Sequence, residues 1–235
     1  MRELKVIAHI HTDFHYKFGI PRQSGLVEQV QGKIVFEPEY RNPDAVRGLE
    51  DFSHIWLLWE FSKARKEDGW SATAAPPRLG GKIRKGIFAT RSPYRPNSIG
   101  LSSVRLERIK QDEKLGPVLY VSGVDLLDGT PIYDIKPYLA YTDSHPEAVD
   151  GFAGEVVDYE LKVRFPEELQ NILPEETRNV VIELLRQDPR PKTEEAVDKE
   201  YRMYYGDYDI WFHVEDQTAV VHQVIRVGKS NNQNV

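Results

Sequence analysis

The part of the sequence best suited to chemistry is a cationic, aromatic segment with a restricted backbone. Residues 81–102, GKIRKGIFATRSPYRPNSIGLS, contain five Lys or Arg residues, two aromatic residues and no acidic residue. Pro, Asn and Gly residues restrict and turn the backbone just after Arg91 and Ser92. Guanidinium groups and aromatic faces on a fixed loop suit an anionic or planar ligand, although a solvated basic surface with a turn has the same composition.

Charge is unevenly distributed along the chain. The whole sequence has 31 Lys and Arg against 37 Asp and Glu, a net charge of −6. Residues 63–108 hold 11 basic and 3 acidic residues, whereas residues 151–235 hold 10 basic and 17 acidic residues. A local cationic patch can attract phosphate groups even in an acidic protein, and the alternative is an ordinary charged face that is balanced elsewhere.

The first 150 residues read mostly as strands. Apolar residues alternate with polar ones near the start, which is typical of a half-buried strand. Asn42 and Pro43 predict the cap and first residue of a short helix through Leu49. Short strands at this spacing predict a small antiparallel barrel or sandwich. The expected strands cover residues 4–10, 33–40, 54–61, 83–90, 101–109, 118–124 and 132–139.

The sequence changes character near Asp150. Two prolines, Pro166 and Pro174, can each begin a helix, and four apolar residues form a stripe on the second one. Two strands are expected after these helices, at 202–214 and 218–227. We therefore predict a mainly β fold with a small α+β domain appended. Its divisions are a barrel domain over 1–150, an α+β domain over 151–228 and a disordered polar tail over 229–235.

Several common chemistries lack their signatures in this sequence. There is no cysteine, so disulfides and thiolate metal sites are excluded, and there is no P-loop, H-E-x-x-H or G-x-G-x-x-G after a strand. His9 and His11 would share one strand face, which suits either a metal or a plain polar face; we expect no metal. The longest apolar run, 55–61, is too short to span a bilayer, so we expect a soluble cytoplasmic protein.

Four blocks of the sequence resemble the TrmO family of S-adenosylmethionine-dependent tRNA methyltransferases. In order, over roughly the first 140 residues, they read KFGIPRQSGL, AVRGLEDFSHIWLLWEF, FATRSPYRPNSIGLS and DLLDGTPIYDIKPYL. The resemblance implies a non-Rossmann β-barrel that binds the cofactor, commonly near the interface of a homodimer. It also implies methyl transfer to N6 of the adenosine at position 37, 3′ of the anticodon, once that base carries a threonylcarbamoyl group.

The same resemblance implies which residues form the site. Ser62 and Lys63 stand where many members of the family have a sequence similar to His-Gln. Each stretch that the resemblance implies could also have a purely structural role, as a loop, an ion pair, a strand or a turn. Asp128 is the best single candidate to take the N6 proton, with His54 and Asp134 as alternatives, although a modest base suffices. The cofactor-binding residues implied are Pro21, Arg22, Gln23, Ser62, Lys63, Arg91, Leu101, Asp128, Gly129, Thr130 and Pro131. The residues expected to contact the anticodon loop are Lys82, Arg84, Lys85, Tyr94 and Arg95.

Two other classes of function fit the sequence. One is a barrel that binds S-adenosylmethionine or tRNA without turnover, and the other is a small-molecule methyltransferase on the same fold. The aromatic residues near the C-terminus also have two interpretations, because they could stack on RNA bases or form the core of the small domain. These residues are Tyr201, Tyr204, Tyr205, Tyr208 and Trp211.

Overall fold

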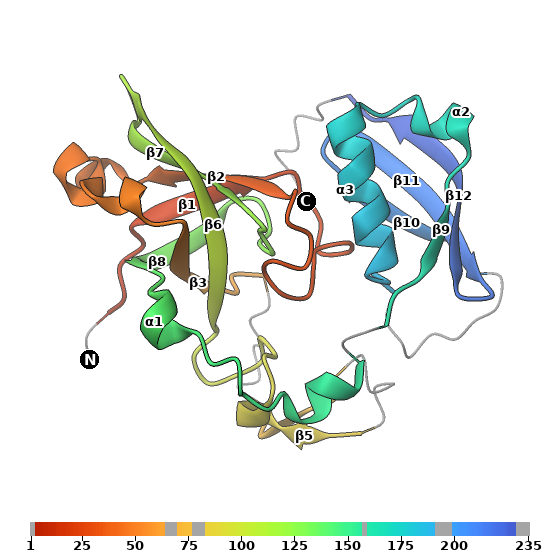
Figure 1. Ribbon diagram of the computed structural model, residues 1–235, viewed down its shortest axis with the longest axis horizontal. Coiled ribbons are helices and arrows are strands. Elements are labelled where there is room, and N and C mark those ends of the chain that lie inside the picture. The colour runs from red at the N-terminus through yellow and green to blue at the C-terminus, as the bar shows by residue number, and fades with distance from the viewer. Residues whose placement is uncertain (1–2, 64–69, 77–82, 157–158, 191–198, 229–235) are drawn as a thin grey trace.

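The computed structural model describes residues 3–63, 70–76, 83–156, 159–190 and 199–228, which form two lobes (Figure 1). The first lobe is a closed barrel of six antiparallel strands in the order β1-β2-β7-β6-β3-β8. This confirms the expected antiparallel barrel and decides against a sandwich. The barrel strands are β1 (Ala8–Thr12), β2 (Gln31–Phe36), β3 (His54–Glu60), β6 (Ile99–Asp112), β7 (Gly116–Ser122) and β8 (Thr130–Pro137).

Alternating apolar residues fill the inside of the barrel. On β3, Ile55, Leu57 and Trp59 are buried, and the residues between them lie on the outer wall. Ile10 and Ile132, from neighbouring strands, are fully buried in the same interior. Because side chains of a six-stranded barrel meet at its axis, this interior is a packed core and ligands must bind at an end or on the wall.

One end of the barrel gathers three long connections, and we call it the site end. Here β1, β3 and β7 end, and β2, β6 and β8 begin. The connections are residues 13–30, 61–98 and 123–129. The first and the third are joined directly, because Gly25 N–H donates to Gly123 O over 2.9 Å. Segments far apart in the sequence are therefore neighbours at this end.

Several expected elements are shorter than predicted or different in kind. The strand expected over 33–40 ends at Phe36 and is followed by a 3-10 turn, η1 (Pro38–Tyr40), because Pro38 has no N–H for a strand ladder. The Asn42 side chain caps Asp44 N as predicted, but the turn it starts is the 3-10 helix η2 (Pro43–Val46). The strand expected over 83–90 is mostly irregular. It contains the short strand β5 (Lys85–Gly86), which pairs with β4 (Thr73–Ala74), followed by the 3-10 helix η5 (Ile87–Ala89). Another 3-10 helix, η3 (Leu49–Asp51), lies just before β3.

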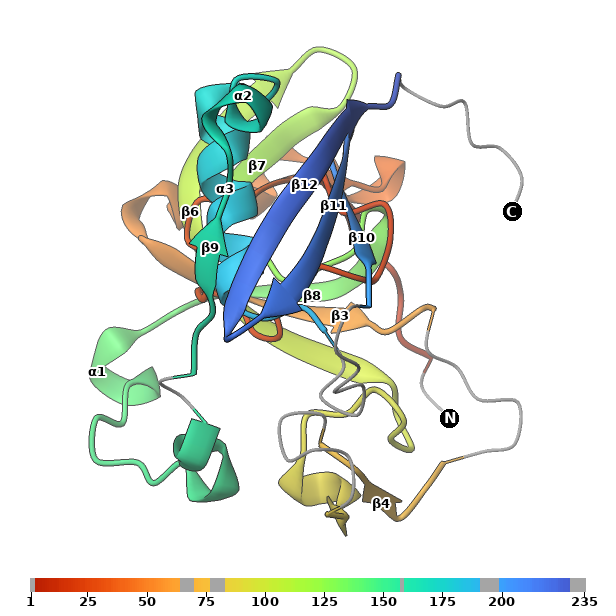
Figure 2. The same ribbon diagram turned by 90° about the vertical axis from the view of Figure 1, so that its right-hand side faces the viewer.

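The second lobe is a four-stranded sheet with helices, in the order β10-β11-β12-β9 (Figure 2). Its helix α3 (Glu175–Arg186) buries the apolar stripe that the sequence predicts. The single strand expected over 202–214 is wrong, because Gly206, with φ of 55°, turns the chain there. The remaining elements are β9 (Lys162–Arg164), α2 (Glu167–Gln170), β10 (Tyr201–Tyr205), β11 (Tyr208–Glu215) and β12 (Thr218–Arg226).

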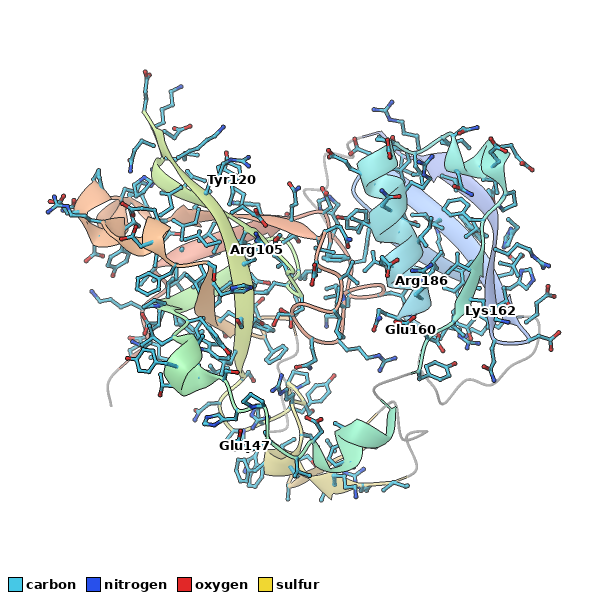
Figure 3. The ribbon with its side chains drawn as sticks, viewed as in Figure 1. Arg105, Tyr120, Glu147, Glu160, Lys162 and Arg186 are labelled. Atoms are coloured by element: carbon cyan, nitrogen blue, oxygen red, sulfur yellow. The ribbon has the colours of Figure 1, made fainter. Side chains whose placement is uncertain are left out.

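The two lobes share one core and are linked by the segment 138–161, on which Glu147 lies (Figure 3). This segment includes α1 (Ala140–Asp143) and η6 (Gly151–Val156), and it passes the small β4-β5 sheet, where Lys85 lies over the Phe152 ring. Phe14 from the 13–30 connection packs edge-on against Tyr205, with ring centroids 5.3 Å apart. The second lobe is thus packed against the loops of the site end.

Candidate active site

The three connections at the site end carry nearly all the residues that the sequence analysis singles out. Pro21, Arg22 and Gln23 lie in the first connection, and Arg91 lies in the second. Asp128 lies in the third, two residues before β8. The antiparallel barrel topology brings these segments together, since every second connection must return to the same end of the barrel.

A polar cluster joins all three connections, and we call it the Gln23–Arg91–Asp125 cluster. Arg91 Nη1 donates a hydrogen bond to Gln23 Oε1, which ties the second connection to the first. The Arg91 charge also acts on Asp125, whose carboxylate accepts a hydrogen bond from the backbone N–H of Ser24. The guanidinium and the amide are therefore in direct contact, and the Asp125 carboxylate lies within range of the Arg91 charge beside the barrel core.

Asp125 is held by a chain of hydrogen bonds that leads into the barrel. Ser102 Oγ donates to Asp125 Oδ1 over 2.7 Å, and Trp59 Nε1 donates to Ser102 Oγ over 3.0 Å. Burial raises the pKa of Asp125 to about 6, against the lowering effect of these hydrogen bonds and of Arg91. The sequence gives Asp125 no specific role. The signal available was that Asp125 and Asp134 flank the 128–131 turn with carboxylates, which indicates a polar pocket beside the basic segment.

Asp128 is fixed against the end of β1. Its Oδ1 accepts a hydrogen bond from Thr12 N over 3.1 Å and lies 3.3 Å from His11 Nδ1. His15 Nδ1 lies 3.9 Å from Asp128 Oδ2. Close by, burial raises the pKa of Asp13, and neighbouring carboxylates add to that rise, whereas His15 opposes it. Asp128 thus belongs to a second group of titratable side chains, with no direct bond to Arg91 among the interactions described.

The other implied cofactor residues differ in how they are placed. Arg22 extends toward the second lobe, where its Nη2 donates to the carbonyl oxygens of Asp188 and Arg190 over 3.2 and 3.1 Å. Lys63 offers its carbonyl to Lys17 Nζ over 2.5 Å, so this turn contributes main chain to the site end. Ser62 and Lys63 are exposed just after β3, and Leu101 is 56% exposed on the outer wall. Thr130 is buried, and Pro131 pairs with His9 of β1.

Two alternatives for the proton acceptor lie elsewhere. His54 begins β3 and so sits at the opposite end of the barrel. Asp134 lies on the outer wall, where its Oδ2 is 3.0 Å from Lys136 Nζ. The length of the barrel separates His54 from the Gln23–Arg91–Asp125 cluster, whereas Asp134 shares the outer wall with Leu101, because both pair with Leu58. Sequence spacing alone could not reveal either placement.

The residues expected to contact RNA lie in the second connection. Arg95 Nη1 donates to Thr90 O over 2.8 Å, so this side chain braces its own loop. Arg84 is bonded in a similar way, to Thr73, and Lys85 lies over Phe152. Tyr94 is 42% exposed, and Lys82 lies outside the described residues.

The His9 and His11 pair does not converge on one point. His9 Nδ1 lies 2.8 Å from Glu37 Oε1, toward the end of the barrel opposite the site end. His11 instead faces Asp128 at the site end. Among the residues that the structure describes, no group of three or more His, Asp or Glu side chains could hold a metal ion. In the same part of the chain, no helix is both long and apolar enough to cross a bilayer.

The Gln23–Arg91–Asp125 cluster fits S-adenosylmethionine chemically. This cofactor presents a carboxylate, an ammonium group, two ribose hydroxyls and an adenine ring. The Arg91 guanidinium supplies donors for a carboxylate, Gln23 Oε1 accepts from that guanidinium and holds it in place, and the Asp125 carboxylate supplies an acceptor beside them. The exposed side chain of Leu101 supplies an apolar surface near the same end.

Comparisons with known proteins agree over both lobes. A family model for the tRNA-methyltransferase O N-terminal domain matches residues 9–144, and one for the TrmO C-terminal domain matches residues 158–227. The tRNA (adenine(37)-N6)-methyltransferase of Escherichia coli (strain K12) is 40% identical over 222 residues, which are 91% of this chain and 94% of that protein. The human protein of the same name is 37% identical over 153 residues, 63% of this chain and 32% of its own length.

Solved structures show the same likeness. A crystal structure of TrmO from Pseudomonas aeruginosa superposes with a TM-score of 0.74 at 32% identity, and the match covers 96% of this chain and 99% of that chain. A further crystal structure of TrmO superposes with a TM-score of 0.76, also at 32% identity. From the matches over both lobes, the chain belongs to the tRNA-methyltransferase O family.

Proposed function

We propose that this protein transfers a methyl group from S-adenosylmethionine to N6 of adenosine 37 in tRNA, on a base that already carries a threonylcarbamoyl group. The observation that carries the proposal is the Gln23–Arg91–Asp125 cluster at the site end of a closed barrel. Relatives that match along most of the chain, such as the Escherichia coli protein, are named tRNA (adenine(37)-N6)-methyltransferase, which supports the same reaction.

Arg91 and Gln23 hold the cofactor at the site end in this proposal. The implied main-chain and apolar contacts come from Pro21, Ser62, Lys63, Leu101 and the 128–131 turn. When bound, S-adenosylmethionine supplies a methyl group that its sulfonium already activates. The contribution of the protein is then to hold N6 of the base in line with that methyl group and to exclude water from the site.

A carboxylate at the site end takes the proton that N6 loses when its bond to the methyl carbon forms. The sequence points to Asp128, and the structure supports Asp125 more strongly. Burial places the pKa of Asp125 at about 6, so it is ionised at neutral pH and yet basic enough to accept a proton. Asp128 already accepts the Thr12 N–H and lies between His11 and His15, which suits positioning of the turn.

The proposal also includes two surfaces that bind partners, one for the anticodon loop and one for a second copy of the chain. The anticodon loop contacts the second connection through Arg84, Lys85, Tyr94 and Arg95. A second copy of the chain covers the outer wall around Leu101, which is 56% exposed next to its strand partner Leu58. The barrel domain, 1–150, then carries the chemistry and the α+β domain, 151–228, packs against its loops.

Replacing Arg91 by alanine tests the proposed cofactor site. We expect the Kd for S-adenosylmethionine, measured by calorimetry, to rise on the order of 10- to 100-fold, because a charge-assisted hydrogen bond to the carboxylate is lost. Arg47→Ala is the matched control, since Arg47 is exposed and pairs with Asp44 far from the site end. An Arg91→Ala protein that binds the cofactor as well as the control does would remove this residue from the site.

Methyl transfer into tRNA tests the function itself. Total tRNA from cells that lack this protein is incubated with labelled cofactor, digested to nucleosides and compared with tRNA that also lacks the threonylcarbamoyl group. We expect label on the N6-methylated, threonylcarbamoyl-modified adenosine in the first case and none in the second. Label on unmodified adenosine would overturn the modified substrate, and label only in a small-molecule extract would overturn the tRNA function.

A further inference from the structure

A row of aromatic rings and one guanidinium group runs across the outer face of the second lobe, with the first two rings tilted by 38°. Tyr16 packs on Tyr204 with ring centroids 4.6 Å apart, and Arg202 Cζ lies 4.6 Å from the centre of the Tyr204 ring. On the neighbouring strand, the Trp211 ring lies 5.1 Å from Arg202 Cζ. We call these four residues the Arg202 stack.

Strand alternation separates this stack from the core of the lobe. Tyr201, Tyr205 and Tyr208 are buried, whereas Tyr204 and Trp211 are only partly buried on the other face of the sheet. The two interpretations of these aromatic residues, as domain core and as a surface for stacking, therefore apply to different residues. Three tyrosines form core, and the remaining two aromatic residues face outward with Arg202.

A buried carboxylate fixes the guanidinium group in the stack. Asp209 is fully buried, and its Oδ2 accepts hydrogen bonds from Arg202 Nε over 2.6 Å and from Trp211 Nε1 over 3.1 Å. Within the described residues, its Oδ1 has no hydrogen-bond partner. Because a buried charge needs its counterion, Asp209 holds Arg202 and Trp211 in one orientation, even though the Arg202 side chain is 46% exposed.

The Arg202 stack begins at the site end. Tyr16 is 46% exposed and directly follows His15, whose Nδ1 lies 3.9 Å from Asp128 Oδ2. The β10-β11 turn is attached to the same connection, because Gly206 N–H donates to Asp13 O over 2.9 Å. Figure 2 shows β10 and β11 side by side with the 13–30 connection at the β10 edge. Asp128 and the Arg202 stack are therefore both attached to the 13–30 connection, Asp128 through its N–H, which donates to Phe14 O over 2.9 Å.

We infer that the Arg202 stack binds unpaired bases of the RNA that flank the target adenosine. This inference rests on the proposed function, because a target adenosine in the anticodon loop has unpaired neighbours, and an enzyme that modifies a base takes that base out of its stack. Aromatic rings and a guanidinium plane are the surfaces on which single-stranded bases stack. Residues 151–235 hold 17 acidic and 10 basic residues, which disfavours phosphate contact, so binding by this lobe must come from stacking on Tyr16, Tyr204, Arg202 and Trp211.

Paired substitutions separate ring stacking from other roles of these side chains. Tyr16→Ala and Arg202→Lys each raise the KM for tRNA on the order of 10-fold, because each removes a flat face, whereas Tyr16→Phe keeps the ring and the wild-type KM. Arg202→Lys retains a positive charge for Asp209, so its melting temperature reports whether the lobe is intact. The Kd for S-adenosylmethionine and the slope of log Kd for tRNA against log salt stay unchanged in all three variants.

Abasic RNA identifies the occupant of the stack. An anticodon stem-loop in which the bases beside the target adenosine are removed binds the wild type on the order of 10-fold more weakly. The same RNA binds Tyr16→Ala and Arg202→Lys with little further loss, since the stacking partner is already absent. Additive losses, or a wild-type KM in Tyr16→Ala, would overturn the inference and assign this face to a protein partner or to the solvent. Failure of the wild type to methylate any tRNA would instead overturn the proposed function.

Discussion

Replacing Asp125 by asparagine is expected to lower kcat on the order of 100-fold, without loss of folding stability at pH 8. Asparagine keeps an oxygen that can accept the Ser102 hydrogen bond, but it cannot take a proton from N6. In the wild type, kcat/KM should rise with pH through about 6 as Asp125 ionises, and this limb should be absent in the variant. Steady-state rates between pH 5 and 9 measure both effects.

Although Asp125→Asn is expected to be less active than the wild type, it should be the more stable protein above pH 4. The pKa of Asp125 is raised from 3.8 to about 6 in the folded protein, so the folded state retains a proton that the unfolded state releases as pH rises between these values. The wild type therefore loses stability relative to Asp125→Asn over that interval, and the difference stays constant above it. Chemical unfolding at pH 4 and pH 8 checks the sign.

Two further aspartates serve as controls for this prediction. Asp134→Asn, on the outer wall beside Lys136, should leave kcat unchanged. Asp128→Asn tests the choice that the sequence favours. If Asp128→Asn abolishes the acid limb and Asp125→Asn retains full kcat, the proton acceptor is Asp128. A rise in the KM for S-adenosylmethionine alone, with kcat intact, would make Asp125 a binding residue.

Replacing Gly100 by alanine is expected to destabilise the protein by about 1–3 kcal/mol, which is a fall of about 2–12 °C in Tm for a chain of this size. A Cβ at Gly100 would lie 2.3 Å from Trp59 Cε2 and 2.4 Å from Cζ2. The Trp59 ring is buried and packs against Phe61, with ring centroids 4.2 Å apart, so it has little room to move away.

The same substitution should also lower activity. Displacing Trp59 breaks its hydrogen bond to Ser102, which in turn holds Asp125. Gly86→Ala is the matched control, because a Cβ there meets nothing within 4 Å and Gly86 has an ordinary φ of −54°. Differential scanning calorimetry and methyl-transfer rates for the two variants give the comparison. Equal Tm values for Gly100→Ala and Gly86→Ala would show that the ring can adapt.

The sequence by itself determined most strands of the barrel and the main helix of the second lobe. Runs of apolar and β-forming residues identified β3, β6, β7 and β8, whereas the alternation read over 4–10 placed β1 too early, since that strand is Ala8–Thr12. The buried stripe on α3 followed from helical periodicity. Local signals failed where a turn decides the outcome, as at Gly206, which splits the strand expected over 202–214.

Only the tertiary structure distinguishes the surroundings of the three carboxylates and of the aromatic residues. Asp125, Asp128 and Asp134 lie within ten residues of each other, yet Asp125 is partly buried beside Ser102, Asp128 faces two histidines and Asp134 lies on the outer wall. Burial and charge partners set these differences, and both depend on strands that are distant in sequence. Closure of the barrel brings residues 23, 91 and 125 together, because loop neighbours there are fixed by strand order and not by spacing along the chain.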